Sequence, residues 1–368
     1  MSNLNGQIFA HLQPTNRCVA DEIDTPEIII DLDVVENNIL RAQKLISERG
    51  MVARPHIKTH KIPTFARAQL KAGAIGITCQ KLSEAEVMAD AGCSDILISY
   101  NIVGDKKLAR LRELAARVKL TVVADHVKIV QGLDRAMTNG ASLGVSVEFN
   151  TGMGRAGVDS PSNALSVARA ICNAKNLNFT GLMAYPAAGS GNRTLDVLSK
   201  TALFLDENGI HCDVVSTGGT PDLFRLGAVP SHVNEYRAGS YIYNDRSLIV
   251  AGAADVKDCA LRIATTVISR QGSRAMIDAG SKALSSDLFG LEGFGMVIGR
   301  PEITIEGLSE EHGHLKLTSA ETPLAIGEVL HIVPNHACVV SNLFDEIVVH
   351  RGLKFVCRLP VAARGCVK

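Results

Sequence analysis

The chain has 368 residues, of which 46% are hydrophobic and 21% charged, the composition of a globular protein with one large or two ordinary domains. Its 38 basic and 38 acidic residues cancel, so no overall field favours binding to nucleic acid or to a membrane surface. Aromatic residues make up only 4% and tryptophan is absent, which also argues against stacking platforms for single-stranded nucleic acid.

The N-terminus lacks the basic and apolar regions of a signal peptide, and no apolar stretch reaches the roughly 18 residues that cross a bilayer. The nine cysteines are scattered and form no CxxC pair. This pattern argues against a disulfide framework, so we expect a cytoplasmic protein.

Short apolar runs alternate with helix-like segments from about residue 51 onward. The runs predict eight strands at 51–54, 75–78, 96–99, 120–124, 145–149, 179–185, 213–217 and 235–239. Between them, helices are predicted over 62–71, 82–91, 105–118, 126–138, 161–173 and 194–208. This alternation predicts a parallel sheet in a (β/α)8 TIM-like barrel over residues 35–245. An open doubly wound sheet is the alternative, but no GxGxxG follows an early strand.

The pattern changes after residue 246. Short β-rich runs separated by Gly, Pro or charged turns predict a β-domain over residues 246–368. The early run PEIIIDLD (26–33) could pair with it, so that residues 1–34 join this domain.

Basic residues and histidines cluster in RPHIKTHK, directly after the first barrel strand. Active-site loops of a TIM barrel follow its strands, and cationic neighbours favour the nucleophilic form of a lysine amine. Lys58 is therefore a candidate for Schiff-base chemistry. The alternative is an exposed basic loop.

Three later loops carry glycines with groups that bind anions. Arg155 lies in NTGMGRAG after the fifth strand, and its guanidinium could hold an oxyanion. STGGT (Ser216, Thr217, Gly218, Gly219, Thr220) follows the seventh strand and Gly239, Ser240 and Tyr241 follow the eighth, where barrels commonly bind phosphate. Tyr185 ends the sixth strand and could line a cofactor. Ordinary loop and packing roles are the alternatives.

His336 and Cys338 lie in VPNHACVVSNL, within the predicted β-domain. Side chains two residues apart on a strand share a face, so imidazole and thiolate could bind a cation such as zinc. Two ligands would leave positions for water and substrate. A buried cysteine beside a histidine with other partners is the alternative.

Taken together, TPEIIIDLD, RPHIKTHK, TCQKLSEAE, NTGMGRAGV, STGGT, RAGSY and PNHAC resemble the D-threonine aldolase and D-serine dehydratase family. This family is a branch of the alanine-racemase-like, fold-type III pyridoxal-phosphate enzymes. The resemblance runs from about Asp24 to the C-terminus. It implies a barrel with a β-domain, a homodimer, a D-amino acid substrate and a divalent metal beside the cofactor.

The resemblance also implies roles for individual residues. Lys58 matches the lysine that forms a Schiff base with pyridoxal phosphate, and Arg155 matches an arginine near the cofactor's phenolic oxygen. Gln80 and Tyr185 match positions that line the cofactor. Arg237 occupies a position where racemase-like relatives place an arginine facing the pyridine nitrogen and several aldolases carry Gln. The segments 216–219 and 239–241 match the phosphate loops.

His336 and Cys338 match the family's metal pair. Aldolase members resemble His-x-Asp there and dehydratase members His-x-Cys, so Cys338 favours dehydration of D-β-hydroxy amino acids to a 2-oxo acid and ammonia. It also favours zinc over manganese or magnesium. Cleavage to glycine and an aldehyde, and racemisation, are the alternatives. Tyr185 is followed by Pro186, where relatives often carry His or Gln and then Gly, so the substrate pocket is expected to differ.

Overall fold

The computed structural model describes residues 8–137 and 142–368, which form two compact units. We call them the barrel unit and the β unit. The barrel unit comprises Arg41–Lys58, Pro63–Gly239 and Cys366–Lys368. The β unit comprises residues 8–40, Thr59–Ile62 and Ser240–Gly365.

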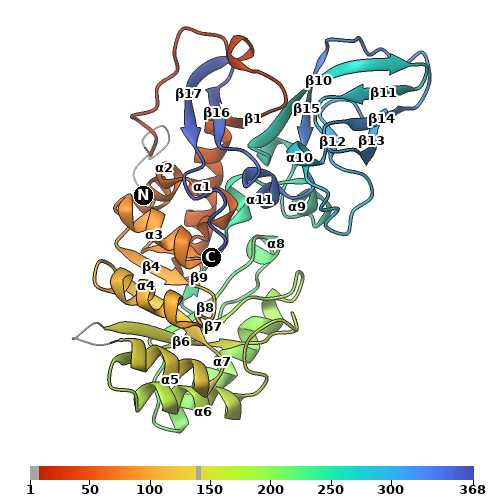
Figure 1. Cartoon of the computed structure of the whole chain (residues 1–368). Helices are drawn as coiled ribbons and strands as arrows, with labels where there is room; N and C mark the ends of the chain where they lie inside the picture. The colour runs from red at the N-terminus through yellow and green to blue at the C-terminus, as the bar shows by residue number, and fades with distance from the viewer. Residues whose placement is uncertain (1–7, 138–141) are drawn as a thin grey trace. The chain divides into compact units, whose positions relative to one another are not determined.

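The barrel unit (Figure 1) contains one curled parallel sheet of eight strands in the order β2-β9-β8-β7-β6-β5-β4-β3. A bridge between His56 and Thr78, with a hydrogen bond from the Thr78 N–H to the Pro55 carbonyl (2.8 Å), links the segments next to β2 and β3. The strands are β2 (Val52–Ala53), β3 (Ile77–Cys79), β4 (Asp95–Ile98), β5 (Lys119–Ala124), β6 (Leu143–Phe149), β7 (Leu177–Ala184), β8 (Val214–Thr217) and β9 (Glu235–Tyr236).

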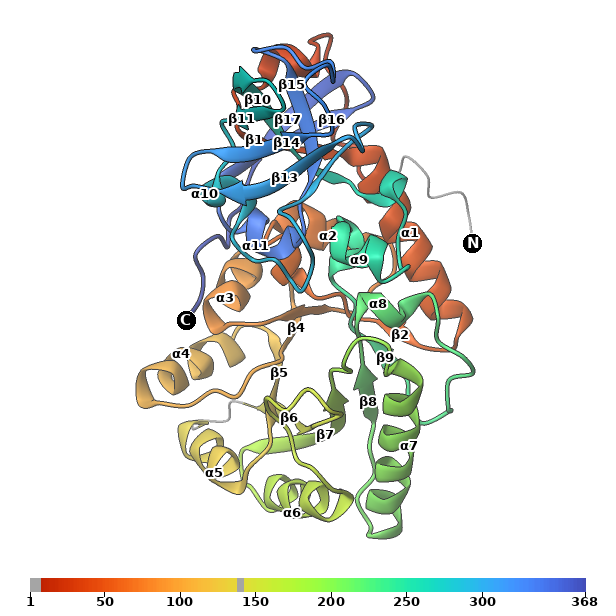
Figure 2. The same cartoon turned by 90° about the vertical axis from the view of Figure 1, so that its right-hand side faces the viewer.

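Helices follow the strands and lie on the outer side of the curled sheet, as Figure 2 shows for α4 to α7. Both sheet faces are therefore covered, and Ile96, Val122 and Leu182 are fully buried. The helices are α2 (Pro63–Lys71), α3 (Leu82–Asp90), α4 (Asp105–Ala115), α5 (Val127–Ala136), α6 (Pro161–Cys172), α7 (Gly191–Glu207) and the short α8 (Thr220–Leu223).

The predicted barrel is confirmed, since all eight predicted strands and all six predicted helices form within a few residues of their expected bounds. Thr138, at the end of one predicted helix, lies outside the described residues, as do residues 1–7 of the predicted N-terminal segment. The 17-residue α1 (Leu32–Glu48) was not predicted. It follows β1 without an intervening turn.

The β unit is built on a mixed sheet with the order β13-β14-β11-β10-β1-β16-β17, and β15 pairs with β10 and β12. The predicted pairing of the early run is confirmed, because β1 pairs antiparallel with β10 and parallel with β16. The strands are β1 (Glu27–Asp31), β10 (Leu261–Gln271), β11 (Arg274–Ile277), β12 (Met296–Val297), β13 (Ile303–Leu308), β14 (Gly313–Leu317), β15 (Val329–Val333), β16 (Glu346–Arg351) and β17 (Lys354–Pro360).

Short helices connect these strands: α9 (Arg246–Val250), α10 (Ser281–Leu284) and α11 (Ala337–Ser341). Val19, Ile29, Ala264, Val348 and Phe355 pack into one buried cluster, which ties the N-terminal segment to the C-terminal strands. In the described part of the chain, no helix combines the length and apolar character that crossing a bilayer requires.

Candidate active site

Lys58 follows β2 in a short 3-10 turn, Ile57–Thr59. Its Nζ lies 5.8 Å from the centroid of the Tyr185 ring, and the Cζ of Arg155 lies 5.1 Å from the same centroid. Within residues 8–137 and 142–368, Lys58 forms no salt bridge with a carboxylate. The structure thus brings together three predicted site residues from the ends of β2, β6 and β7, and leaves the lysine amine without an anionic partner. This environment fits a lysine that reacts with a carbonyl cofactor.

His56 fixes the backbone of Lys58. Its Nδ1 accepts the Lys58 N–H (3.3 Å), while its Nε2 lies 3.1 Å from the Gln80 Oε1. The Gln80 Nε2 donates to the Ser99 carbonyl (3.1 Å), which orients its Oε1 toward the imidazole. His56 therefore carries its proton on Nε2. Gln80, a predicted cofactor-lining residue, contacts His56. No role for His56 was predicted. The His-x-Lys spacing was the available signal, because it allows the imidazole to accept the Lys58 N–H.

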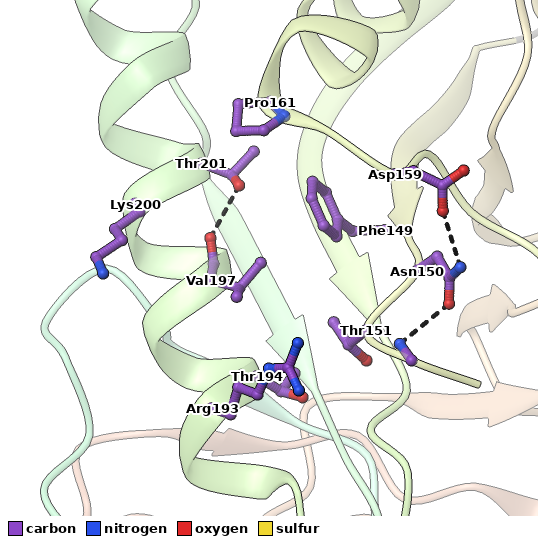
Figure 3. A pocket seen from close by; sticks show the side chains of 11 residues that line it. Phe149, Asn150, Thr151, Asp159, Pro161, Arg193, Thr194, Val197, Lys200 and Thr201 are labelled. Atoms are coloured by element: carbon purple, nitrogen blue, oxygen red, sulfur yellow. Dashed lines mark hydrogen bonds between the residues drawn. The ribbon is translucent and has the colours of Figure 1, made fainter. Parts of the chain in front are cut away.

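A buried carboxylate lies on β6 beside the Arg155 loop. Phe149 points toward α7 on the outside of the sheet (Figure 3), so the preceding residue, Glu148, faces the barrel interior. Burial raises the pKa of Glu148, and the charges of Arg155 and Arg237 only partly oppose this. Glu148 was not predicted as a site residue, although an acidic residue within the apolar run VSVEF is visible in the sequence.

Asn150 holds the start of the Arg155 loop. The Asn150 Oδ1 accepts the N–H groups of Gly152 (3.1 Å) and Gly154 (3.2 Å), and its Nδ2 donates to Asp159 (2.8 Å). Figure 3 shows this arrangement from the pocket between the loop and α7. That pocket lies on the outer side of β6 and contains none of the predicted site residues.

Arg237 is buried in the barrel unit. Its Nη1 donates to the Ser216 hydroxyl and its Nη2 to the Ala184 carbonyl (2.8 Å), so it joins the ends of β7 and β8. Burial lowers the pKa of Arg237 to about 10, although Glu235 and Glu148 favour its charged form. The Ser216 hydroxyl in turn donates to Glu235 (2.6 Å). Both predicted site residues therefore belong to one internal network, and a phosphate role for Ser216 would rest on its backbone.

The glycines after β8 leave room for a ligand. A Cβ at Gly218 would lie 2.8 Å from the Arg237 carbonyl oxygen, so only glycine packs there. Gly219 adopts a φ of +121°, and a Cβ there would meet only the Pro186 Cγ, at 3.5 Å. The Tyr236 hydroxyl donates to the Gly219 carbonyl (2.7 Å) and fixes the turn. Thr217 to Thr220 thus fit a loop that approaches a phosphate closely.

Of the residues predicted around the second phosphate loop, Gly239 ends the barrel unit and Ser240 and Tyr241 belong to the β unit. The Ser240 hydroxyl lies 3.7 Å from the Cys338 Sγ. Ser240 therefore lies next to Cys338 of the predicted metal pair, within the β unit.

His336 and Cys338 lie in a turn into a helix, so the prediction that they share one face of a strand is wrong. β15 ends at Val333, Pro334 has no N–H to continue a ladder, and α11 begins at Ala337. The Asp245 carboxylate accepts the Ala337 N–H (2.9 Å) and fixes the start of the helix.

The pair has a fixed polar environment. The His336 Nδ1 lies 2.8 Å from the Asp287 Oδ2, and the Cys338 Sγ lies 3.2 Å from the Thr59 Oγ1. Burial lowers the pKa of His336, but Cys338, Asp287 and Asp245 together raise it to about 9. Among the described residues, no three His, Cys, Asp or Glu side chains gather as metal ligands. The imidazole of His336 and the thiolate of Cys338 are donors of the kind that a borderline cation binds.

Two family models match the chain. The N-terminal domain of alanine racemase matches residues 30–247, and a putative serine dehydratase domain matches residues 260–350. A D-threonine aldolase of an Arthrobacter species is 33% identical over 361 residues, 93% of each chain. The 3-hydroxy-D-aspartate aldolase of Paracoccus denitrificans is 31% identical over 94% of this chain and 93% of its own. The D-threo-3-hydroxyaspartate dehydratase of a Delftia species is also 31% identical, over 88% and 93%.

Solved structures give the same two activities. D-threonine aldolase from Filomicrobium marinum superposes with a TM-score of 0.88 at 33% identity, over 97% of this chain and 100% of that one. Two D-threo-3-hydroxyaspartate dehydratase variants give TM-scores of 0.84 and 0.83 at 27% and 30% identity, covering 96% and 92% of this chain and 97% of each of theirs. The first replaces a histidine by alanine. The second replaces the cysteine two positions later and is in a metal-free form.

Proposed function

The chain belongs to the D-threonine aldolase and D-serine dehydratase branch of the alanine-racemase-like, fold-type III pyridoxal-phosphate enzymes, and we propose that it cleaves the Cα–Cβ bond of D-β-hydroxy amino acids to give glycine and an aldehyde. The observation that carries this proposal is the match to a D-threonine aldolase over 97% of the chain with a TM-score of 0.88. Two aldolases among the relatives are 33% and 31% identical to this chain. These matches favour carbon–carbon cleavage over the dehydration that Cys338 favoured in the sequence.

In this proposal the barrel unit holds pyridoxal phosphate. Lys58 would bond to its carbonyl carbon, Thr217 to Gly219 would hold its phosphate, and Arg155 would bind its phenolic oxygen. The cofactor, when bound, stabilises the electron pair left on Cα when a bond to that carbon breaks. In Cα–Cβ cleavage the β-hydroxyl would lose its proton as it becomes the aldehyde, and the Lys58 ammonium would give a proton to Cα. In dehydration the Lys58 amine would instead take the Cα proton. His56 fixes the backbone from which that amine extends.

His336 and Cys338 would hold the metal. A cation there would polarise the β-hydroxyl of the substrate as a Lewis acid. A thiolate ligand prefers zinc to magnesium, so we propose zinc, with manganese as the closest alternative. The hydroxyl of Thr59, 3.2 Å from the Cys338 sulfur, would stabilise the thiolate.

Dehydration to a 2-oxo acid and ammonia is the second candidate. The spacing of His336 and Cys338 favours it, because the solved dehydratase variants replace a histidine and a cysteine that are also two positions apart. Both reactions need the same lysine, metal and D-substrate. They differ in whether the Cα–Cβ bond or the Cα–H bond breaks.

A product assay separates the candidates. The purified enzyme is incubated with the D and L forms of threonine, serine, 3-phenylserine and 3-hydroxyaspartate, and glycine, aldehyde, 2-oxo acid and ammonia are quantified. Glycine equal to the substrate consumed, from D forms only, supports the aldolase. Ammonia equal to the 2-oxo acid assigns the dehydratase. Interconversion of D and L forms without either product would restore racemisation. Homodimerisation, part of the same proposal, is tested by light scattering.

A further inference from the structure

A loop after α10 contacts His336, the histidine of the proposed metal pair. Asp287 lies in this loop and places its Oδ2 2.8 Å from the Nδ1 of His336. Its other oxygen, Oδ1, accepts the Phe289 N–H (3.0 Å), and its own N–H donates to the Ser285 hydroxyl (3.1 Å). The carboxylate is therefore fixed by its own loop before it reaches the imidazole.

The same loop is tied to the segment that carries His336. The Asn335 side chain donates to the Gly293 carbonyl (2.8 Å) and accepts a hydrogen bond from the Arg246 Nη1 (3.0 Å). The same Arg246 nitrogen donates to the Glu292 carbonyl (2.6 Å). These contacts hold the loop and the histidine segment in one arrangement within the β unit.

Phe289 covers the imidazole. Its ring centroid lies 4.4 Å from that of His336, and its backbone has a φ of 51°, in the left-handed region that a bulky side chain rarely adopts. Strained residues of this kind persist where the surrounding structure fixes them, often at functional sites. The imidazole is thus held by an ionic hydrogen bond at Nδ1 and by an aromatic ring on one face.

Besides the contact of its Nδ1 with Asp287, the imidazole has a hydrogen bond with Cys338, the other residue of the proposed metal pair. With Nδ1 donating its proton to Asp287, the lone pair of the neutral imidazole lies on Nε2. We propose that Asp287 is a positioning residue that directs the Nε2 of His336 to the catalytic metal. The proposal rests on the proposed function for the identity of the metal pair, and it adds Asp287 as the residue that orients that pair. The Asp287 Oδ2 contacts the imidazole and its Oδ1 is held by the Phe289 N–H, so the carboxylate is placed to orient the metal ligand.

Zinc affinity tests the proposal directly. Zinc dissociation constants are measured by competition with a chromogenic chelator for the full-length cofactor-loaded enzyme and for D287A, D287N and E292Q. Glu292 lies in the same loop and its side chain makes no hydrogen bond or ion pair within the described residues, so E292Q is the matched control. D287A should weaken zinc binding about 10–100-fold, as loss of such partners of metal-bound histidines does. The zinc affinity of D287N should lie between those of D287A and the unchanged E292Q, because its amide oxygen can still accept a hydrogen bond from Nδ1 but carries no charge.

If Asp287 only stabilised the fold, the zinc affinities of D287A, D287N and E292Q would not follow this order. The visible absorbance of the lysine-bound cofactor and the far-ultraviolet circular dichroism show that each variant is folded, and the d–d spectrum of the cobalt-substituted enzyme reports the ligand geometry. Should D287A fail to fold, the near-isosteric D287N decides. Zinc affinity and cobalt spectra within twofold of wild type in the Asp287 variants overturn the proposal. A wild-type enzyme that binds no zinc overturns it together with the metal part of the proposed function. A dehydratase product pattern with the expected affinities overturns only the carbon–carbon cleavage.

Discussion

Two lysines of the barrel unit lie over tyrosine rings, and only one of them carries the proposed chemistry. Lys58 lies 5.8 Å from the Tyr185 ring centroid, and Lys81 lies 3.8 Å from that of Tyr100. We predict that Lys58→Ala loses the visible absorbance of the bound cofactor and lowers the turnover rate by at least about 10²–10⁴-fold, the contribution of a positioned acid or base. Lys81→Ala should keep both, because an exposed cation–π contact contributes only about 0.5–1 kcal/mol. Retained absorbance in Lys58→Ala would reassign the cofactor lysine.

Glu148 connects one buried charge to the stability of the barrel. Burial raises its pKa, so the folded protein binds this proton more tightly than the unfolded chain does. Its ionisation therefore costs stability as the pH rises through the range between the two pKa values, and the cost vanishes below roughly pH 4. We predict that Glu148→Gln raises the melting temperature at pH 8 and that this gain shrinks toward pH 4. Glu113→Gln, on the exposed face of α4, should show no such trend. A gain that grows as the pH falls would contradict this assignment.

Residue types in the sequence pointed to Lys58, Arg155, His336 and Cys338, because each stands in a motif with a chemical reason. Their partners were not predictable in the same way. Asp287 and His336 are 49 positions apart, and their pairing depends on the path of a loop after α10. Glu148 was visible as an acid in an apolar run, but only the fold shows that it is buried near Arg155 and Arg237.

At the scale of elements, the eight barrel strands were predictable because each is a short apolar run that ends at a loop. The helix at α11 was not, because the run EVLHIVPNHACVV continues as apolar residues past the end of β15. Pro334 stops the ladder there, and the N–H that begins the helix is accepted by Asp245, 92 positions away. The end of the strand at Pro334 was visible in the sequence, whereas the acceptor that fixes the start of the helix was not.

The glycine loop after β8 gives a prediction at the same scale. Gly219→Ala should lose about 1–3 kcal/mol of unfolding free energy from backbone strain, because its φ is +121°. Gly104→Ala, at a φ of +100° in open space before α4, should lose a comparable amount. Only Gly219→Ala should also weaken the cofactor's affinity, measured by equilibrium dialysis, because of the two loops only the one after β8 is proposed to hold the phosphate. Equal cofactor affinity in the two variants would place the phosphate elsewhere.

At the scale of the molecule, the two compact units hold different parts of the proposed chemistry. Lys58, Arg155, Tyr185 and the glycine loop belong to the barrel unit, whereas His336, Cys338 and Asp287 belong to the β unit. The chain passes between the units several times, and the step from Lys58 to Thr59 is one of these passages. Thr59, next in the chain to Lys58, lies 3.2 Å from the Cys338 sulfur.

This division predicts the effect of removing the metal. No group assigned to the cofactor in the barrel unit is a metal ligand, so exhaustive chelation should abolish turnover while the visible absorbance of the bound cofactor stays unchanged. His336→Ala should give the same result, and added zinc should restore the chelated wild type but not the variant. Because the proposed metal would act on the β-hydroxyl and not on Cα–H, chelated enzyme should still exchange the Cα proton of D-alanine with deuterium in heavy water, which nuclear magnetic resonance detects. Loss of the absorbance on chelation would mean that the metal also holds the cofactor. Full turnover after chelation would remove the metal from the reaction, and the polarisation of the β-hydroxyl would then fall to protein side chains alone.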